Sequence, residues 1–164
     1  MESDALEVLF GTYRREIFLY LYSLSKNKAM AEDLLQETFL KALLSLKKEH
    51  KNVRAWLYLV ARNLFLNEIK KKDNRTELCE EEPSSPEGDP LNGILNDEKT
   101  KQLYLALGGL DFKKREVLEL QYFGELPVRE IAGILKISEE NVRVLAYRGK
   151  KELKKRLEAM EYEF

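Results

Sequence analysis

The stretch from Val128 to Leu157 limits the possible folds of this chain more than any other part of it. It contains two helical patterns separated by a short turn. Two apolar stripes are predicted to face each other: Ile131, Ala132 and Leu135 in the first helix, and Val142 and Leu145, with or without Tyr147, in the second. Ser138 is predicted to cap the second helix, whose first turn gains stability from two glutamates next to the positive end of the helix dipole.

The second of these helices is strongly basic. Its cationic residues are Arg143, Arg148, Lys150, Lys151, Lys154, Lys155 and Arg156. A short helix, a three-residue turn and a longer basic helix are the parts of a helix-turn-helix, which places its second helix in the DNA major groove. The alternative is a plain helical hairpin with a solvated charged face. Spacing, cap and charge together favour DNA binding.

Charge is distributed unevenly along the 164 residues, although the net charge is only −1. Residues 1–72 carry 13 basic and 9 acidic side chains, residues 73–98 carry 1 and 9, and residues 99–164 carry 14 and 11. Two mildly basic segments are therefore joined by an acidic one. The 44% of hydrophobic residues suffices for a core, and Gly and Pro are scarce outside the acidic stretch, which favours an all-α protein.

Apolar periodicity divides the chain into three parts. Residues 1–73 contain three amphipathic helical patterns that can bury one another's stripes, so we expect a first compact domain. Residues 74–98 hold three of the four prolines and almost no apolar periodicity, which predicts a flexible linker. Residues 99–164 form the second domain, in which Asp111 is expected to cap a helix that Gly124 ends. The expected fold is thus two small helical domains joined by a flexible linker.

The reactive residue types are too few for most kinds of catalysis. One Cys and one His leave no zinc site and no Cys–His pair, and no glycine-rich nucleotide motif is present. We therefore expect neither an enzyme nor a bound cofactor or metal. The N-terminus lacks the pattern of a signal peptide, and the apolar runs are too short to span a bilayer, so a cytoplasmic protein without membrane insertion is expected.

Three segments, taken in order, resemble one known family. They are AEDLLQETF (31–39), RAWLYLVARNLFLNEIKKK (54–72), and LDFKKREVLELQYF (110–123) together with the helix-turn-helix. They are similar to the extracytoplasmic-function type of bacterial RNA polymerase sigma factor, which consists of sigma domains two and four only. The resemblance covers nearly the whole chain apart from the acidic stretch and the last few residues.

The resemblance implies two binding surfaces in the first domain. Asp33, Gln36 and Glu37 would dock on the coiled coil of the β′ clamp of core polymerase, where an acidic and amide face suits basic partner residues. The third helix would read the −10 promoter element as single strand, through Arg62, Asn63, Asn67, Lys70 and Lys71, with Lys72 beside them. The loop Lys47–Asn52 would form the rim of the pocket for an extruded base.

The resemblance also implies that the second domain reads the −35 element as duplex DNA. The implied contacts are Ser138, Glu139, Asn141, Arg143, Tyr147, Arg148, Lys150 and Lys151. Among them Arg143 suits guanine, whereas Lys150 and Lys151 suit phosphates. The implied partners are core polymerase (β′ clamp and β flap), promoter DNA and an anti-sigma factor.

Several residues depart from the family pattern. Lys136 stands in the turn where the family has Gly, and a left-handed backbone there would cost roughly 1 kcal/mol. Pro127 replaces a Ser cap, Leu145 a basic residue and Asn67 an Asp. The alternative function is a stand-alone regulator that shares the helix-turn-helix, has an N-terminal sensing domain and needs no polymerase.

Overall fold

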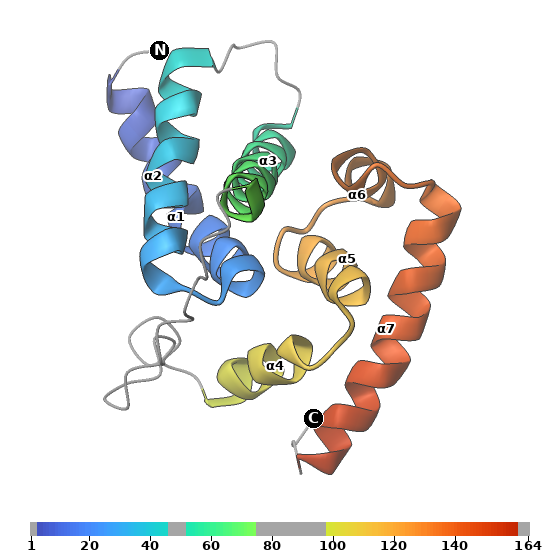
Figure 1. Ribbon diagram of the computed structural model, residues 1–164. Helices are drawn as coiled ribbons and strands as arrows, with labels where there is room; N and C mark the ends of the chain where they lie inside the picture. Colours follow the sequence, from blue (N-terminus) through green and yellow to red (C-terminus); the bar gives the residue numbers. More distant parts are fainter. Residues whose placement is uncertain (1–2, 46–51, 75–97, 161–164) are drawn as a thin grey trace. The chain divides into compact units, whose positions relative to one another are not determined.

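A computed structural model describes residues 3–45, 52–74 and 98–160, and all of its regular structure in these ranges is α-helical. The chain divides into two compact units, Met1–Ser85 and Pro86–Phe164. Figure 1 shows helices α1 to α3 in the first unit and α4 to α7 in the second. The predicted all-α fold with two helical bodies, the second containing a helix-turn-helix, is confirmed.

The first unit contains α1 (Ser3–Ser25), α2 (Lys28–Ser45) and α3 (Val53–Asn74), and the three helices contact one another. Side-chain amides start the second and third helices. The Asn27 side-chain oxygen accepts from the Met30 amide at 3.1 Å, and the Asn52 side-chain oxygen accepts from the Ala55 amide at 3.0 Å. Such caps satisfy amides that have no partner inside the helix, so both boundaries follow from local chemistry.

The core of the first unit combines the predicted leucine stripes with aromatic rings. Phe10 of α1 meets Phe39 of α2 edge to face at 4.8 Å between ring centroids, and Tyr20 meets Tyr58 of α3 in the same manner at 5.0 Å. The Tyr58 hydroxyl donates to Glu16 at 2.8 Å. These contacts hold α1 against both other helices. Helical periodicity predicts burial of Ala31, Leu34, Leu35, Phe39, Ala42, Leu43 and Leu46. The first five are buried and Leu43 is half-buried, whereas Leu46 lies outside the described residues.

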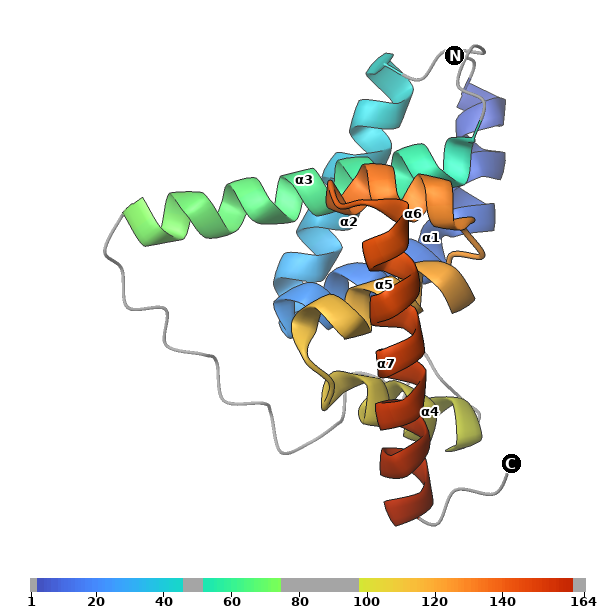
Figure 2. The ribbon, with the colours of Figure 1, turned by 90° about the vertical axis from the view of Figure 1, so that its right-hand side faces the viewer.

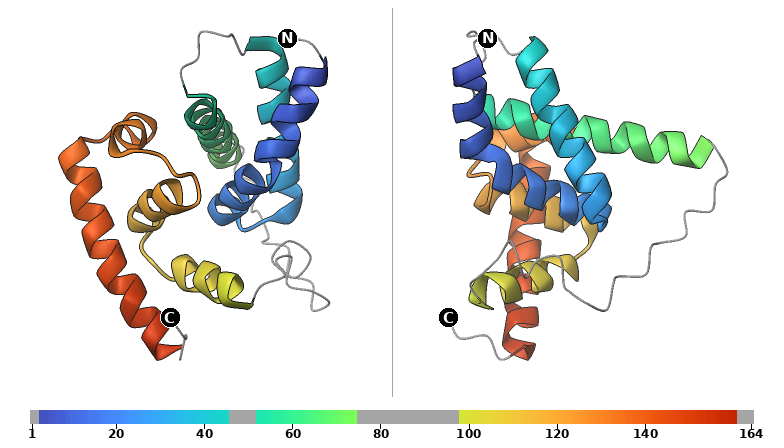
Figure 3. Two further views of the ribbon diagram at one scale, coloured as in Figure 1. Left: turned by 180° about the vertical axis from the view of Figure 1, so that it is seen from behind. Right: turned by 90° about the vertical axis from the view of Figure 1, so that its left-hand side faces the viewer.

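The second unit contains α4 (Glu98–Gly108), α5 (Phe112–Tyr122), α6 (Val128–Leu135) and α7 (Glu139–Ala159). Leu107, Leu110 and Leu118 form a buried cluster, against which Leu153 of α7 packs. Helix α7 contacts α4, α5 and α6, and Figure 3 shows it running past all three. One long helix therefore connects every other helix of this unit.

The predictions at the two ends of α5 have different outcomes. Asp111 occupies the N-cap position, but its side chain makes no capping hydrogen bond. The left-handed residue after the helix is Glu125, with φ of 51°, whereas no glycine in the described ranges has positive φ. Gly124 instead donates its amide to the Glu119 carbonyl at 3.0 Å. The glycine thus ends the helix without supplying the backbone conformation for which glycine is usually selected.

Candidate nucleic-acid interface

Helix α7 begins where its side-chain chemistry predicts. The Ser138 hydroxyl oxygen accepts a hydrogen bond from the Asn141 amide at 3.0 Å, and Ser138 itself has extended backbone angles. Glu139 and Glu140 occupy the first turn, where their charge is favourable to the helix dipole. The predicted N-cap is confirmed, and it defines which side chains stand at the start of the helix.

The turn between α6 and α7 has the geometry of a helix-turn-helix. Lys136 adopts left-handed angles (φ 57°, ψ 45°) and donates its amide to the Ala132 carbonyl. The Ile137 amide donates to the same carbonyl at 3.1 Å. Ile131 and Val142, one on each helix, are completely buried. The predicted strain at Lys136 is therefore real, and apolar contact between the two helices holds the turn in place.

The predicted duplex-reading residues are all exposed to solvent. They are Ser138, Glu139, Asn141, Arg143, Tyr147, Arg148, Lys150 and Lys151. Glu139, Arg143 and Tyr147 follow one another at spacings of four and therefore share a face. Tyr147 was also considered as a core residue, and its 62% exposure excludes that role. The face offers carboxylate, guanidinium and phenol groups near the helix start and ammonium groups farther along.

Two lysines of α7 lie over exposed tyrosine rings. The Lys151 ammonium is 5.3 Å from the centroid of the Tyr147 ring, and the Lys150 ammonium is 5.4 Å from that of Tyr122. Tyr122 is the last residue of α5 and is 53% exposed. Its position at the very end of α5 is the feature from which its exposure could have been predicted, whereas helical periodicity takes no account of where a helix ends. The contact of each ammonium group with the face of an aromatic ring favours this position of the lysine side chain.

Helix α3 presents the predicted single-strand-reading residues on its outer side. Asn63, Asn67, Lys70 and Lys71 are exposed. Asn67 lies four residues after Asn63 and three and four residues before the two lysines, so it neighbours all of them on the helix surface. Arg62, by contrast, is half-buried. The structure thus brings the amides and lysines together and sets Arg62 apart from them.

The C-terminal part of α3, residues 66–73, has no buried side chain. Burial ends at Phe65, and none of the residues 66–73 is buried, so this part projects beyond α1 and α2 (Figure 2). Leu66 and Ile69, 39% and 37% exposed, lie beside the polar row. These two residues are not among the predicted single-strand-reading residues, because leucine and isoleucine in a helical pattern usually belong to the core. The projecting surface combines amide, ammonium and apolar groups.

Helix α2 carries the predicted docking residues Asp33, Gln36 and Glu37 on its solvent face. All three are exposed, and the opposite face holds the buried stripe. Leu40 and Leu44 continue the row at 55% and 75% exposure. These two leucines are not among the predicted docking residues. The surface therefore has an acidic and amide part followed by an apolar part.

Some predictions fall outside the described ranges. Of the loop Lys47–Asn52 only Asn52 is described, as the cap of α3, and of the predicted linker 74–98 only its two end residues are described. Within residues 3–45, 52–74 and 98–160, no cluster of three His, Cys, Asp or Glu side chains is arranged to hold a metal ion. Over the same ranges, no helix is both long and apolar enough to cross a membrane.

The fold and the exposed basic helix define a DNA-binding protein of the helix-turn-helix class. Comparison with known proteins is more specific. Residues 9–75 match the family described as sigma-70 region 2, and residues 100–153 match sigma-70, region 4. The chain belongs to the extracytoplasmic-function group of sigma-70 RNA polymerase sigma factors, whose members are transcription initiation factors.

Individual relatives agree with this assignment. The RNA polymerase sigma factor YlaC of Bacillus subtilis is 32% identical in an alignment of 167 positions, which covers 94% of this chain and 92% of YlaC. The extracytoplasmic-function sigma factor SigM of the same organism is 29% identical over 151 residues, covering 91% of this chain and 93% of SigM. The sigma factor RpoE of Bartonella quintana, solved with the anti-sigma factor NepR, has the same fold, with a TM-score of 0.69 at 21% identity over 96% of this chain and 98% of RpoE.

Proposed function

We propose that the chain directs core RNA polymerase to promoters with two separated recognition elements. Residues 1–73 would bind core polymerase and the −10 element, residues 99–164 would bind the −35 element, and residues 74–98 would connect them. The observation that carries the proposal is the capped helix α7, whose exposed side chains combine base-edge and phosphate chemistry on a helix-turn-helix. The chain supplies recognition, and no catalytic step is assigned to it.

In this proposal α7 reads the −35 element as duplex. Side chains near the start of a recognition helix reach base edges, whereas those farther along contact the backbone. Arg143 can donate two hydrogen bonds to guanine, and Asn141 can pair with adenine or hold a phosphate. Arg148, Lys150 and Lys151 would neutralise phosphates, which positions the helix without reading sequence.

Helix α3 would capture the −10 element after strand separation. Unstacking a base costs a few kcal/mol, which must be recovered by contacts to the exposed base and its backbone. Asn63 and Asn67 can hydrogen-bond base edges, Lys70 and Lys71 can follow the phosphates, and Leu66 provides apolar surface beside them. Because this part of α3 projects from the unit, it can reach a strand without rearrangement of the core.

The face of α2 would dock on core polymerase. Its two carboxylates would contact basic residues of the β′ clamp, so reversal of their charge should weaken association. We expect Asp33→Lys combined with Glu37→Lys to reduce the affinity for purified core polymerase at least about tenfold, as measured by fluorescence anisotropy. Glu7→Lys, at an exposed position on α1, is the matched control. If the double variant and the control bind core equally well, this face is not the docking surface.

Transcription in vitro with purified core polymerase tests the whole proposal. We expect RNA synthesis from defined start sites only when the chain is present, and loss of initiation when either upstream element is scrambled. A stand-alone regulator would instead bind duplex DNA without core polymerase and direct no initiation. The absence of any defined start site with active core polymerase would overturn the proposal.

We also propose an anti-sigma partner that competes with core polymerase. The support is the relative RpoE, which was solved in complex with the anti-sigma factor NepR. The partner should co-purify with the chain from cells of its source and suppress transcription in the assay above. Added core polymerase at excess should displace it. Co-purifying proteins that leave transcription unchanged would count against such a partner.

A further inference from the structure

Helix α7 is longer than a helix-turn-helix requires, and its second half is attached to α4 and α5. Helices α7 and α5 lie close together at Gly149, where a Cβ atom would lie 3.0 Å from Leu118 Cδ1 and 3.4 Å from Lys114 Cβ. Gly149 is buried between the exposed reading residues and the C-terminal turns. This crossing places α7 directly against α5, with no side chain of its own between the two helices.

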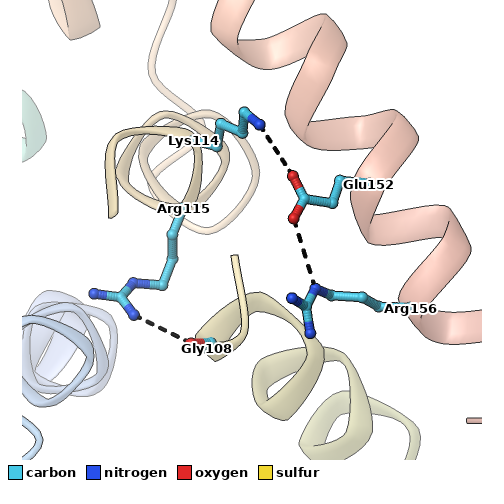
Figure 4. Close-up of polar contacts among 5 residues, drawn as sticks. All are labelled: Gly108, Lys114, Arg115, Glu152 and Arg156. Carbon is cyan, nitrogen blue, oxygen red and sulfur yellow. Dashed lines mark hydrogen bonds and ion pairs between the residues drawn. The ribbon is translucent and has the colours of Figure 1, made fainter. Parts of the chain in front are cut away.

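Beyond this crossing, one ion pair and one close contact join the C-terminal turns of α7 to the rest of the unit. Figure 4 shows Glu152 between two cations: Lys114 Nζ of α5 lies 3.0 Å from its Oε2 atom, and Arg156 Nε lies 3.9 Å from its Oε1 atom. The Arg156 guanidinium packs on Gly109, where a Cβ atom would lie 2.9 Å from Arg156 Cζ. We call Lys114, Glu152, Arg156 and Gly109 the α7 anchor.

The surface that receives the anchor is itself fixed. Arg115 of α5 donates to the Gly108 carbonyl at 3.4 Å, and the Leu110 amide donates to the Leu107 carbonyl at 3.0 Å, so the corner between α4 and α5 is closed (Figure 4). Leu107 and Leu110 are buried together with Leu118, beneath Leu153 of α7. The anchor therefore joins α7 to a part of the unit that cannot easily follow its movement.

Because α7 is one continuous helix, its inclination at the anchor determines the position of its reading residues. Arg143 lies six residues before Gly149, which is about 9 Å along the axis. A tilt of about 10° around Gly149 would displace Arg143 by about 1.6 Å, whereas a direct hydrogen bond tolerates only a few tenths of an ångström. A small change at the anchor would therefore disrupt contacts to bases.

We propose that Glu152 and Arg156 are positioning residues that set the inclination of α7 and thereby its discrimination between −35 sequences. This inference rests on the proposed function of α7. Glu152 and Arg156 would act on the geometry of α7 and not on the free energy of unfolding, since partly exposed ion pairs add little to stability. Neither residue needs to touch a base.

Two adjacent glycines provide the test. Gly109→Ala keeps every charge but displaces the Arg156 guanidinium, whereas a Cβ atom at Gly108 would meet nothing within 4 Å. Holoenzyme of each variant is titrated with the promoter fragment recovered by transcription and with the same fragment carrying a scrambled −35 element. We expect Gly109→Ala to lower the ratio of the two affinities about fivefold, at the lower end of what one good base contact contributes. Gly108→Ala should leave the ratio unchanged.

A second variant separates geometry from charge. Glu152→Gln removes a negative charge near the lysines of α7, so charge alone would tighten binding to both fragments. The anchor predicts that discrimination falls nevertheless, and that Arg156→Gln lowers it in the same way. If Glu152→Gln tightens binding to both fragments equally while discrimination is kept, Glu152 acts only through its charge and the inference fails.

Amide chemical shifts of the free full-length protein give a readout independent of DNA. Gly109→Ala should shift the signals of residues 139–148, which form the N-terminal half of α7, whereas the anchor contacts its C-terminal half. Gly108→Ala should leave these signals unchanged. Equal spectra in this region for both variants would overturn the inference even if promoter recognition is established. Conversely, a wild-type holoenzyme that binds the two fragments equally well would refute the proposed function. The chemical-shift measurement would still test the effect of the anchor on α7, because it uses the protein without DNA.

Discussion

Lys136 offers a direct measurement of strain in the helix-turn-helix. Its left-handed backbone (φ 57°, ψ 45°) costs a residue with a side chain about 1–2 kcal/mol relative to glycine. Glycine in turn loses about 0.4–1 kcal/mol because it is more flexible in the unfolded chain. The exposed Lys136 side chain contributes little burial. Lys136→Gly should therefore stabilise the second unit by about 0.8 kcal/mol, the difference of the two effects.

Scanning calorimetry of the full-length chain can measure this effect. For a unit of this size, about 0.8 kcal/mol corresponds to a rise in Tm of about 3–6 °C. Lys136→Ala is the matched control, because alanine loses the side chain but keeps the backbone penalty, so its Tm should stay within about 3 °C of wild type. Lys26→Gly, at the left-handed residue after α1 (φ 54°), should raise the transition of the first unit and thereby assign both transitions. If Lys136→Gly is no more stable than Lys136→Ala, the reasoning from backbone strain is refuted.

Three further pairs of substitutions test other parts of the second unit. Arg143→Ala should change the preference among −35 sequences, whereas Lys151→Ala should weaken binding to all of them and reduce the salt dependence of log K by about 0.9; equal effects on every sequence would remove Arg143 from base reading. Gly149→Val should destabilise the chain by about 1–3 kcal/mol through collision with α5, whereas Gly133→Ala, where the Cβ atom meets nothing within 4 Å, should stabilise it by about 1 kcal/mol in denaturant titrations. Ser138→Ala should lower stability by about 1 kcal/mol and Ser138→Asn should not; similar midpoints for both would mean that the cap contributes nothing.

Features that depend on nearby residues were predicted well from the sequence. The Ser138 cap needs only its own hydroxyl and an amide three residues later, and the left-handed Lys136 follows from the length of the turn. The buried stripe of α2 follows from helical periodicity. These features are local, so the sequence around each residue contains the information that determines it.

Features that depend on distant residues were predicted less well. Leu66 carries an apolar group in a helical pattern and nevertheless remains exposed, because it lies in residues 66–73 of α3, none of which is buried. Periodicity predicts which side of a helix is apolar, and packing decides how far along the helix that side is covered.

The residue order by itself determined most helices of the described ranges, the uneven charge and the exposed row at the start of α7, because helix caps, periodicity and solvation of charge act over a few neighbouring residues. Only the tertiary structure decided that Gly149 is the crossing with α5, that Arg156 rests on Gly109, and that α3 projects beyond its own core. Those arrangements depend on the simultaneous packing of helices far apart in the chain, and close packing leaves each helix only one position relative to its neighbours.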